Sequence, residues 1–263
     1  MTALDRRGPT DAPVVVIVHG AGISRKMWLP QTGSLSEDFQ TVAPDLPGHG
    51  DRAHEPFRFE VAVETIEAII RDVGENCTVL VGQSLGGYVA TEVAARQPDR
   101  IAGLVLSGSS AEYRGLLGVR TAVSSLLFRR GARSHTVTDW FEGVMTERLR
   151  SLSLPDETVD EILAAGVSLD AWGQAGVALV GRDFPARLAA YEGPVLFANG
   201  EEDRINRPAA IERNGEVEDG RVVVIRDAGH TVNLERPDAY SRVVREFVLN
   251  HCGEGSPSGG VGL

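Results

Sequence analysis

A serine that directly follows an apolar run is the first residue of this sequence to indicate chemistry. Ser84 lies at the centre of Gly82-Gln83-Ser84-Leu85-Gly86, immediately after the apolar run 77–81. This G-x-S-x-G pattern is typical of a nucleophile elbow, a sharp strand-to-helix turn that raises the serine hydroxyl above the end of a sheet. The strained backbone of such a turn tolerates only small neighbours, which Gly82 and Gly86 provide. We therefore expect Ser84 to be a nucleophile.

A serine hydroxyl becomes an effective nucleophile only beside a base, and the base needs a carboxylate that orients it. His230 follows the last strand-like run of the chain and precedes a helix-compatible segment. The candidate acids are Glu201, Glu202 and Asp203, which follow an earlier apolar run in Gly200-Glu201-Glu202-Asp203, and Asp227, which is close to His230 in the sequence. These residue types indicate acyl transfer by a serine, a histidine and an acid.

The segments around these residues have the pattern of an α/β fold. The β-branched run 14–18 predicts a strand that is buried on both faces of a parallel sheet. The strand 77–81, the helix 85–96 and the strand 101–107 predict a parallel βαβ unit, and Pro98 marks the end of the helix. Similar patterns predict further strands at 41–44, 194–199 and 221–226 and further helices at 61–73 and 238–249.

Composition limits the class of protein. A chain of 263 residues with 42% hydrophobic content suits one α/β domain that carries an insertion. The net charge of −11 argues against a nucleic-acid or anionic-membrane partner. No apolar run approaches a membrane span, and residues 1–13 have no signal-peptide core, so we expect a cytoplasmic protein that acts on a small molecule. The sequence leaves the oligomeric state open.

The cysteines and the remaining motifs indicate no cofactor. We interpret Cys77 as a buried thiol of a core strand and Cys252 as an incidental thiol at the start of a loose tail. The sequence has neither H-E-x-x-H nor paired-cysteine spacing, and Gly20-Ala21-Gly22 lacks the third glycine of a dinucleotide fingerprint. We therefore expect a reaction without metal or cofactor.

Three motifs in order give the chain a family resemblance. His19-Gly20-Ala21-Gly22 follows the first predicted strand, Asp45-Leu46-Pro47-Gly48-His49-Gly50 follows the next, and the serine motif comes third. In this respect the sequence resembles the α/β-hydrolase fold superfamily from about residue 14 to residue 249. The resemblance implies a mostly parallel α/β-hydrolase sheet with helices on both faces and a helical cap insertion.

The resemblance also implies roles for particular residues. Members commonly read G-x-x-D with a proline a few residues on, which favours Asp203 as the acid of a triad with Ser84 and His230. An oxyanion hole would use the N–H of Leu85 and that of Ala21, or less favourably that of Gly22. A serine at position 84 argues against the aspartate nucleophile of haloalkane dehalogenases and the usual epoxide hydrolases.

The segment 111–185 has no strand-like run, and the resemblance makes it the cap that sets substrate choice. We expect residues 1–110 and 186–251 to form the hydrolase core and 252–263 to be a disordered tail. Within the cap the candidate pocket residues are Phe128, Trp140, Phe141, Leu163 and Trp172, and Gly22 would contact substrate from the core. The two tryptophans and Phe128 are the main substrate-binding candidates.

The sequence therefore predicts a serine hydrolase that cleaves a carboxylic ester, lactone or thioester through an acyl-enzyme. Two alternatives stay open. Members of the family with the same residues include C–C hydrolases and lyases of specialised metabolism. Others are small-molecule receptors or regulators with slow or no turnover.

Overall fold

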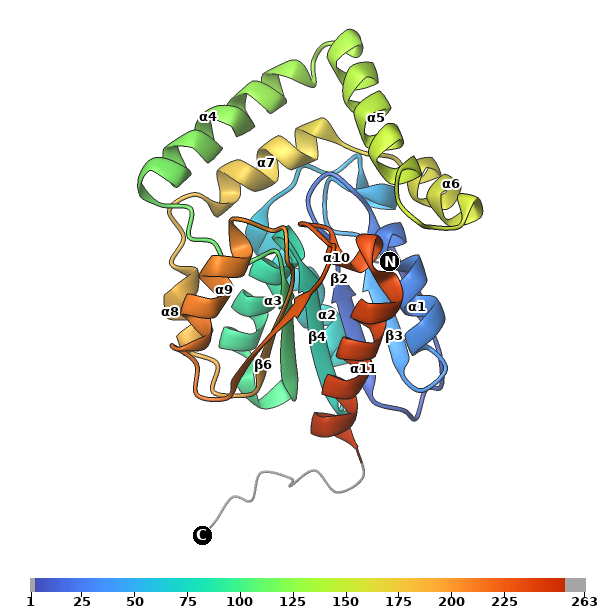
Figure 1. The fold of residues 1–263 in the computed structure, drawn as a ribbon, viewed down its shortest axis with the longest axis vertical. Coiled ribbons are helices and arrows are strands. Elements are labelled where there is room, and N and C mark those ends of the chain that lie inside the picture. The colour runs from blue at the N-terminus through green and yellow to red at the C-terminus, as the bar shows by residue number, and fades with distance from the viewer. Residues whose placement is uncertain (1–2, 254–263) are drawn as a thin grey trace.

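The computed structural model describes residues 3–253, and its centre is a seven-stranded sheet (Figure 1). The strand order is β1-β3-β2-β4-β5-β6-β7, with β1 antiparallel to β3 and every other pair parallel. The strands are β1 (Leu4–Arg7), β2 (Val14–Val18), β3 (Gln40–Pro44), β4 (Thr78–Gln83), β5 (Gly103–Ser107), β6 (Val195–Gly200) and β7 (Gly220–Ile225). This arrangement confirms the predicted mostly parallel α/β fold.

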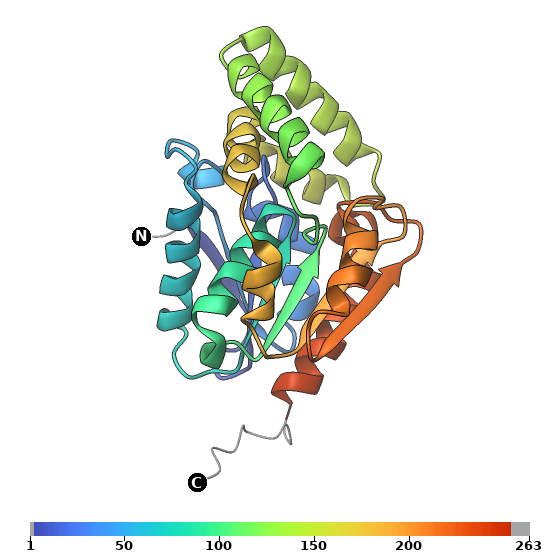
Figure 2. The same ribbon diagram turned by 90° about the vertical axis from the view of Figure 1, so that its left-hand side faces the viewer.

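Helices cover both faces of the sheet (Figures 1 and 2). The α-helices are α1 (Leu29–Leu35), α2 (Phe59–Asp72), α3 (Leu85–Arg96), α4 (Gly115–Gly131), α5 (His135–Arg150), α6 (Asp156–Ala164), α7 (Leu169–Leu179), α8 (Phe184–Ala189), α9 (Asn206–Asn214), α10 (Val232–Glu235) and α11 (Pro237–Cys252). Short 3₁₀ turns are η1 (Arg25–Trp28), η2 (Gly50–Arg52) and η3 (Pro98–Arg100). Helices α2, α3 and α8 pack on one face, and α1 and α11 pack on the other.

The two faces of β2 show how the sequence builds these layers. Val14 and Val16 belong to the core that contains α2 and α3, whereas Val15 and Ile17 belong to the core that contains α1 and α11. Side chains alternate between the faces of a strand, so a strand between two helical layers needs an apolar residue at every position. The unbroken run of β2 meets this requirement.

Strand β1 was not predicted. Its sequence, Leu-Asp-Arg-Arg, is polar and has no apolar alternation, because it lies at the edge of the sheet and pairs only with β3. Leu4 packs against the edge of the core, and ion pairs accompany the rest of the strand, since Asp5 binds Arg25 at 2.9 Å and Lys26 at 2.8 Å.

Between β5 and β6 the chain forms helices α4 to α7, which lie above the carboxyl edge of the sheet (Figure 1). We call these four helices, residues 115–179, the helical insertion. Helix α4 packs on α7, and α5 packs on α6. Helix α8 spans the predicted boundary between 185 and 186, where we expected the core to resume, and packs on α3 of the core.

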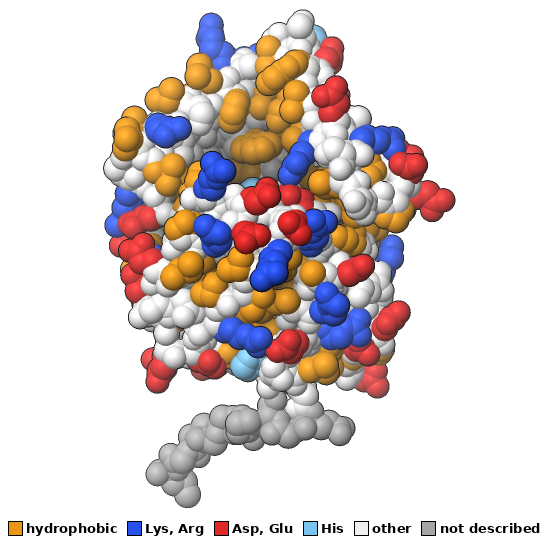
Figure 3. Space-filling model, viewed as in Figure 1, with side chains coloured by type: hydrophobic (Ala, Val, Ile, Leu, Met, Phe, Trp, Pro, Cys, Tyr) orange, Lys and Arg blue, Asp and Glu red, His pale blue; other side chains and the backbone are white. Residues whose placement is uncertain are grey.

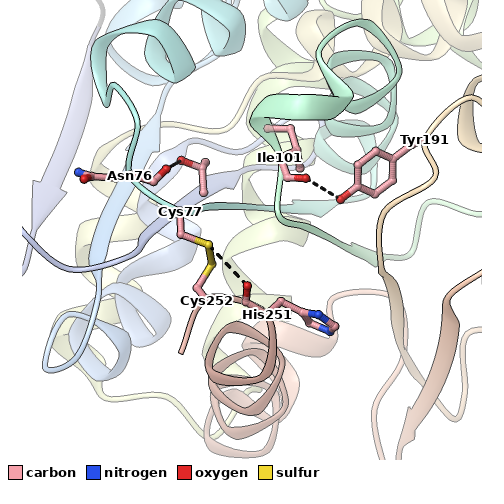
Figure 4. The surroundings of a disulfide bond; sticks show 7 residues. Asn76, Cys77, Ile101, Tyr191, His251 and Cys252 are labelled. Carbon is pink, nitrogen blue, oxygen red and sulfur yellow. Dashed lines mark hydrogen bonds between the residues drawn. A yellow bond between two sulfur atoms is a disulfide. The ribbon is translucent and has the colours of Figure 1, made fainter. Parts of the chain in front are cut away.

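The expectation of two unpaired cysteines was wrong, because Cys77 and Cys252 form a disulfide (Figure 4). Their Cα atoms are 5.7 Å apart, a usual separation for this bond. Cys252 is the last residue of α11 and not part of a loose tail, since this amphipathic helix runs back along the sheet to the start of β4. The rest of the predicted tail, 254–263, lies outside the described residues.

Within residues 3–253 no single helix is long and apolar enough to cross a membrane. Helices α6 and α7 reach the required length and composition only as a pair, and the pair is bent by 76°.

Candidate active site

Ser84 occupies a strained turn between β4 and α3. Its backbone has φ 51° and ψ −118°, in the positive-φ region that side chains disfavour. Its N–H donates to the Ser107 carbonyl at 2.7 Å, which ties the turn to the neighbouring strand β5. A Cβ at Gly82 would lie 2.4 Å from the Gly87 Cα, and a Cβ at Gly86 would lie 2.1 Å from the Val18 carbonyl oxygen. The two flanking glycines are therefore required by close backbone contacts.

His230 and Asp203 come together from two loops. His230 follows β7 and Asp203 follows β6, and His230 Nδ1 lies 3.0 Å from Asp203 Oδ2. Asp203 is buried, and its other oxygen accepts the N–H groups of Ile205 at 3.1 Å and Asn206 at 2.8 Å. Burial opposes ionisation of Asp203, but the hydrogen bonds from His230 and Asn206 and the charge of His230 outweigh it and lower the pKa to about 2.

An ionised Asp203 is only an acceptor, so it selects the His230 tautomer with the proton on Nδ1. The Nε2 lone pair is then free to accept a proton. Ser84 Oγ makes no hydrogen bond to His230 within the described residues, a common state of such pairs before substrate tightens them. The backbone of Gly108 passes directly against the ring, since a Cβ there would lie 2.8 Å from His230 Cε1.

The rival acids lie elsewhere. Asp227 has a positive φ of 52°, is mostly exposed and pairs with Arg236 at 3.5 Å, not with His230. Glu201 and Glu202 are also exposed. Of the carboxylates weighed in the sequence, Asp203 is the one in contact with the histidine.

Two buried histidines shape the loop after β2. His19 Nε2 accepts the Leu46 N–H at 2.9 Å while its Nδ1 donates to the Gly20 carbonyl at 2.7 Å. His49 Nε2 accepts the Gly22 N–H at 3.0 Å and its Nδ1 donates to a carbonyl at 2.9 Å. Burial lowers the pKa of His19 to about 4 and, with the charge of His19 as a second cause, that of His49 to about 3. Both rings are neutral near pH 7.

The predicted oxyanion donors differ in whether their N–H groups are already hydrogen-bonded. The Gly22 N–H is bound to His49, so it is not free to bind an anion. In the part of the chain that the structure describes, the N–H groups of Ala21 and Leu85 have no hydrogen-bond partner, and both residues line the same pocket as Ser84. Two free donors therefore flank the serine.

The pocket above Ser84 has a volume of about 210 Å³. Its floor contains Ala21, Ser84 and Leu85, and its walls come from the segment before α4 and from α4 and α7, with Tyr113, Thr121, Ser124, Ser125, Phe128, Trp172, Ala175, Gly176 and Leu179. Figure 3 shows a hollow beneath the helical insertion with hydrophobic side chains around it. The pocket lining thus combines apolar side chains with several hydroxyl groups.

The predicted pocket residues have different fates. Phe128 and Trp172 line the pocket, and Phe141 supports Trp172 with ring centroids 5.7 Å apart. Trp140 does not line it, because its side chain points to solvent from α5 and is 66% exposed. Leu163 packs against the core on the α11 side. Gly22 lies against Trp172, where a Cβ would approach the ring to 2.9 Å.

Sequence reasoning missed the side chains that fix the loops of the site. Asn206 Oδ1 accepts the N–H groups of Ser110 and Ala111 at 3.2 Å each, which joins the Asp203 loop to the segment after β5. Gln83 Nε2 donates to the His230 carbonyl at 3.1 Å. Gln83 was available as the variable residue of the elbow motif, whereas Asn206 gave no signal without the fold.

The strand order, the elbow and the pocket define a class, the α/β hydrolases. A model of the alpha/beta hydrolase family matches residues 15–243, and the chain therefore belongs to this family. It is similar to the pimeloyl-[acyl-carrier protein] methyl ester esterase of Neisseria meningitidis, with 28% identity over 260 residues that cover 93% of this chain and 97% of that one. It is also 27% identical to carboxylesterase YbfK of Bacillus subtilis, over 94% and 82% of the two chains.

A solved structure shows the same fold. The thermophilic esterase of Thermogutta terrifontis superimposes with a TM-score of 0.76 at 24% identity and covers 94% of this chain and 92% of its own. Together these matches confirm the predicted family and the predicted class of enzyme, a carboxylesterase-like hydrolase.

Proposed function

We propose that this protein hydrolyses a carboxylic ester, lactone or thioester of a small molecule through an acyl-enzyme on Ser84. The observation that carries the proposal is the His230–Asp203 hydrogen bond of 3.0 Å beside a pocket that has Ser84 and two unbonded N–H groups on its floor. The names of the two curated relatives, both esterases, support a carboxylic ester over a C–C bond as the target.

In the proposed reaction Ser84 Oγ attacks the acyl carbon while its proton passes to His230 Nε2. Asp203 stays ionised, holds Nδ1–H and stabilises the imidazolium that forms. When the C–O or C–S bond breaks, His230 returns the proton to the leaving group, and an ester of Ser84 remains. Water then attacks the acyl carbon while His230 takes its proton. When the bond to Ser84 Oγ breaks, His230 returns that proton to Ser84 and the acid is released.

The N–H groups of Ala21 and Leu85 would bind the oxyanion of each tetrahedral intermediate. Donors of this kind are effective because they are fixed before the charge develops, and losing one typically costs about 10²- to 10³-fold in rate. The His49 bond to Gly22 supports this role, since it fixes the peptide that follows Ala21.

We further propose that the helical insertion acts as the cap of the site. Phe128 of α4 and Trp172 of α7 would bind the apolar part of the substrate, because both line the pocket over Ser84. The hydroxyl groups of Thr121, Ser124 and Ser125 would meet its polar atoms.

The test is labelling with a fluorophosphonate probe, followed by peptide mapping. The wild type should carry one adduct, on Ser84, and Ser84→Ala should lose both the adduct and turnover of model esters. Ser36→Ala changes a half-buried serine at the end of α1, which is not among the residues that line the pocket, and should behave as wild type. Full turnover in Ser84→Ala would contradict the proposal. Binding of a small molecule without any labelling would favour a receptor, and turnover of dienoic keto acids instead of esters would favour a C–C hydrolase.

A further inference from the structure

One carboxylate accepts hydrogen bonds from both sides of the turn that carries His230. Glu235, the last residue of α10, accepts the Gly229 N–H on Oε2 at 2.9 Å. Its other oxygen accepts the Thr231 N–H at 3.2 Å and the Thr231 hydroxyl at 2.8 Å. The residues immediately before and after His230 are therefore bonded to the same side chain.

The surroundings of Glu235 make these bonds effective. Its side chain is only 11% exposed. Burial opposes ionisation, but the N–H of Gly229, the hydroxyl and N–H of Thr231 and the charge of Arg148 lower the pKa of Glu235 below its usual value. Hydrogen bonds to a charged acceptor are about twice as strong as neutral ones, and partial burial limits competition from water.

Arg148 of α5 also reaches Glu235, at 3.0 Å, and joins the turn to the helical insertion. The Arg148 side chain is 54% exposed, and ion pairs of exposed side chains contribute little, typically about 0–1 kcal/mol. The hydrogen bonds to the turn are the stronger part of this cluster.

We propose that Glu235 is a positioning residue for His230, acting through its bonds to Gly229 and Thr231 and not through its ion pair with Arg148. This inference rests on the proposed function, in which His230 Nε2 takes the Ser84 proton. Proton transfer requires the base within about 2.6–3.2 Å of the hydroxyl. The Asp203 bond fixes one side of the ring, and Glu235 fixes the backbone from which the ring projects.

The decisive variant is Glu235→Gln, which keeps the shape but replaces one acceptor oxygen by an NH₂ group that cannot bind an N–H donor. We expect kcat and the rate of fluorophosphonate labelling of Ser84 to fall by about 10-fold or more, because small misplacements of reacting groups cost up to about 10²-fold. KM should change little, since Glu235 is not among the residues that line the pocket. Thr231→Val, which removes one of the three bonds, should give a smaller loss in the same direction.

Two controls separate positioning from stability. Glu92 is a buried carboxylate that pairs with Arg96 at 2.8 Å and with Arg187 at 3.2 Å on another part of the fold, so Glu92→Gln should lower the melting temperature without lowering kcat. Arg148→Met should retain a kcat close to that of wild type.

Each contrary result has a distinct meaning. Wild-type labelling rates in both folded Glu235→Gln and Thr231→Val would overturn the positioning role. A loss in Arg148→Met as large as that in Glu235→Gln would overturn it as well, because the ion pair would then carry the effect. Full turnover in Ser84→Ala would instead overturn the proposed function.

Discussion

At the scale of single residues, the loop after β2 depends on two buried histidines that each keep one proton on Nδ1. His19 and His49 each donate from Nδ1 and accept on Nε2, with ring centroids 4.8 Å apart. Protonation of either ring would turn its acceptor nitrogen into a donor that faces a backbone N–H. Burial and this conflict explain why both rings resist charging.

These histidines predict an acid-labile fold. Their pKa values are lowered in the folded chain from 6.5 to about 4 for His19 and about 3 for His49. Between pH 6.5 and these lowered values, the unfolded chain therefore binds more protons than the folded chain. Stability is then fully present above about pH 6.5 and is lost as the pH falls toward 4, by on the order of 3 kcal/mol for His19 alone. Asp203 adds a further loss only below pH 3.8.

Urea unfolding at a series of pH values measures this loss. His49→Gln should flatten the slope between pH 6.5 and 4, because an amide can donate and accept but does not titrate in this range. His54 is exposed, and His54→Gln should leave the slope unchanged. An equal slope in wild type and His49→Gln would show that His49 is not responsible.

At the scale of elements, the pocket depends on how closely α4 approaches α7. A Cβ at Gly173 would lie 2.7 Å from the Ser125 carbonyl and 3.0 Å from the Arg129 nitrogen, both backbone atoms of α4. A side chain at this position cannot be accommodated by a change of rotamer alone. Because Gly173 has no side chain, α4 and α7 pack in contact beside the pocket.

Gly173→Ala should therefore move α4 away from α7. We expect a loss of about 1–3 kcal/mol in stability, typical of overpacking, together with a raised KM for esters, because both helices line the pocket. Gly143 of α5 has open space at its Cβ position, so Gly143→Ala should instead stabilise the fold by roughly 0.5–1 kcal/mol. Thermal unfolding and steady-state kinetics of the two variants test this contrast, and an unchanged KM in Gly173→Ala would contradict it.

The elements also show what sequence can predict. The run 14–18 and the helix 85–96 have the predicted bounds, because strong apolar patterns and a proline mark their ends. Strand β1 escaped detection because ion pairs and backbone pairing hold it. Trp140 and Trp172 looked alike in the sequence, since the face that an insertion helix turns to the pocket is decided by packing between helices.

The same limit applies to the site. Chain order and motif singled out Ser84, Asp203 and His230, and their catalytic roles stay proposals. No local pattern indicated that Asn206 and Gln83 would bridge separate loops, because their partners are 95 or more positions away in the sequence.

At the scale of the whole molecule, the disulfide joins distant parts of the chain. Cys77 and Cys252 are 175 positions apart, and the bond fastens the end of α11 to the start of β4. Bonds of this kind persist mainly in oxidising compartments. The cytoplasmic location remains a prediction from the sequence, and the disulfide does not favour it.

Closing so long a loop should contribute substantially to stability. Cys252→Ser should lower the free energy of unfolding by about 2–5 kcal/mol, because the unfolded chain regains the freedom that the bond removes. The activity of the folded protein should not change, since the bond lies at the amino edge of the sheet, away from Ser84. Chemical unfolding with and without a thiol reductant tests this, and a reductant should have no effect on Cys252→Ser.

The disulfide also sets the path of a mechanical load. A pull on the carboxyl end of α11 would pass through the sulfur–sulfur bond to the start of β4, without first unwinding the helix. Strand β4 is paired on both sides, with β2 and β5, so the load would be borne by shear of the central sheet. Because α11 ends on the side of the molecule opposite the helical insertion (Figure 1), an enzyme tethered there would be anchored through a central strand of its sheet, with the helical insertion facing away from the support.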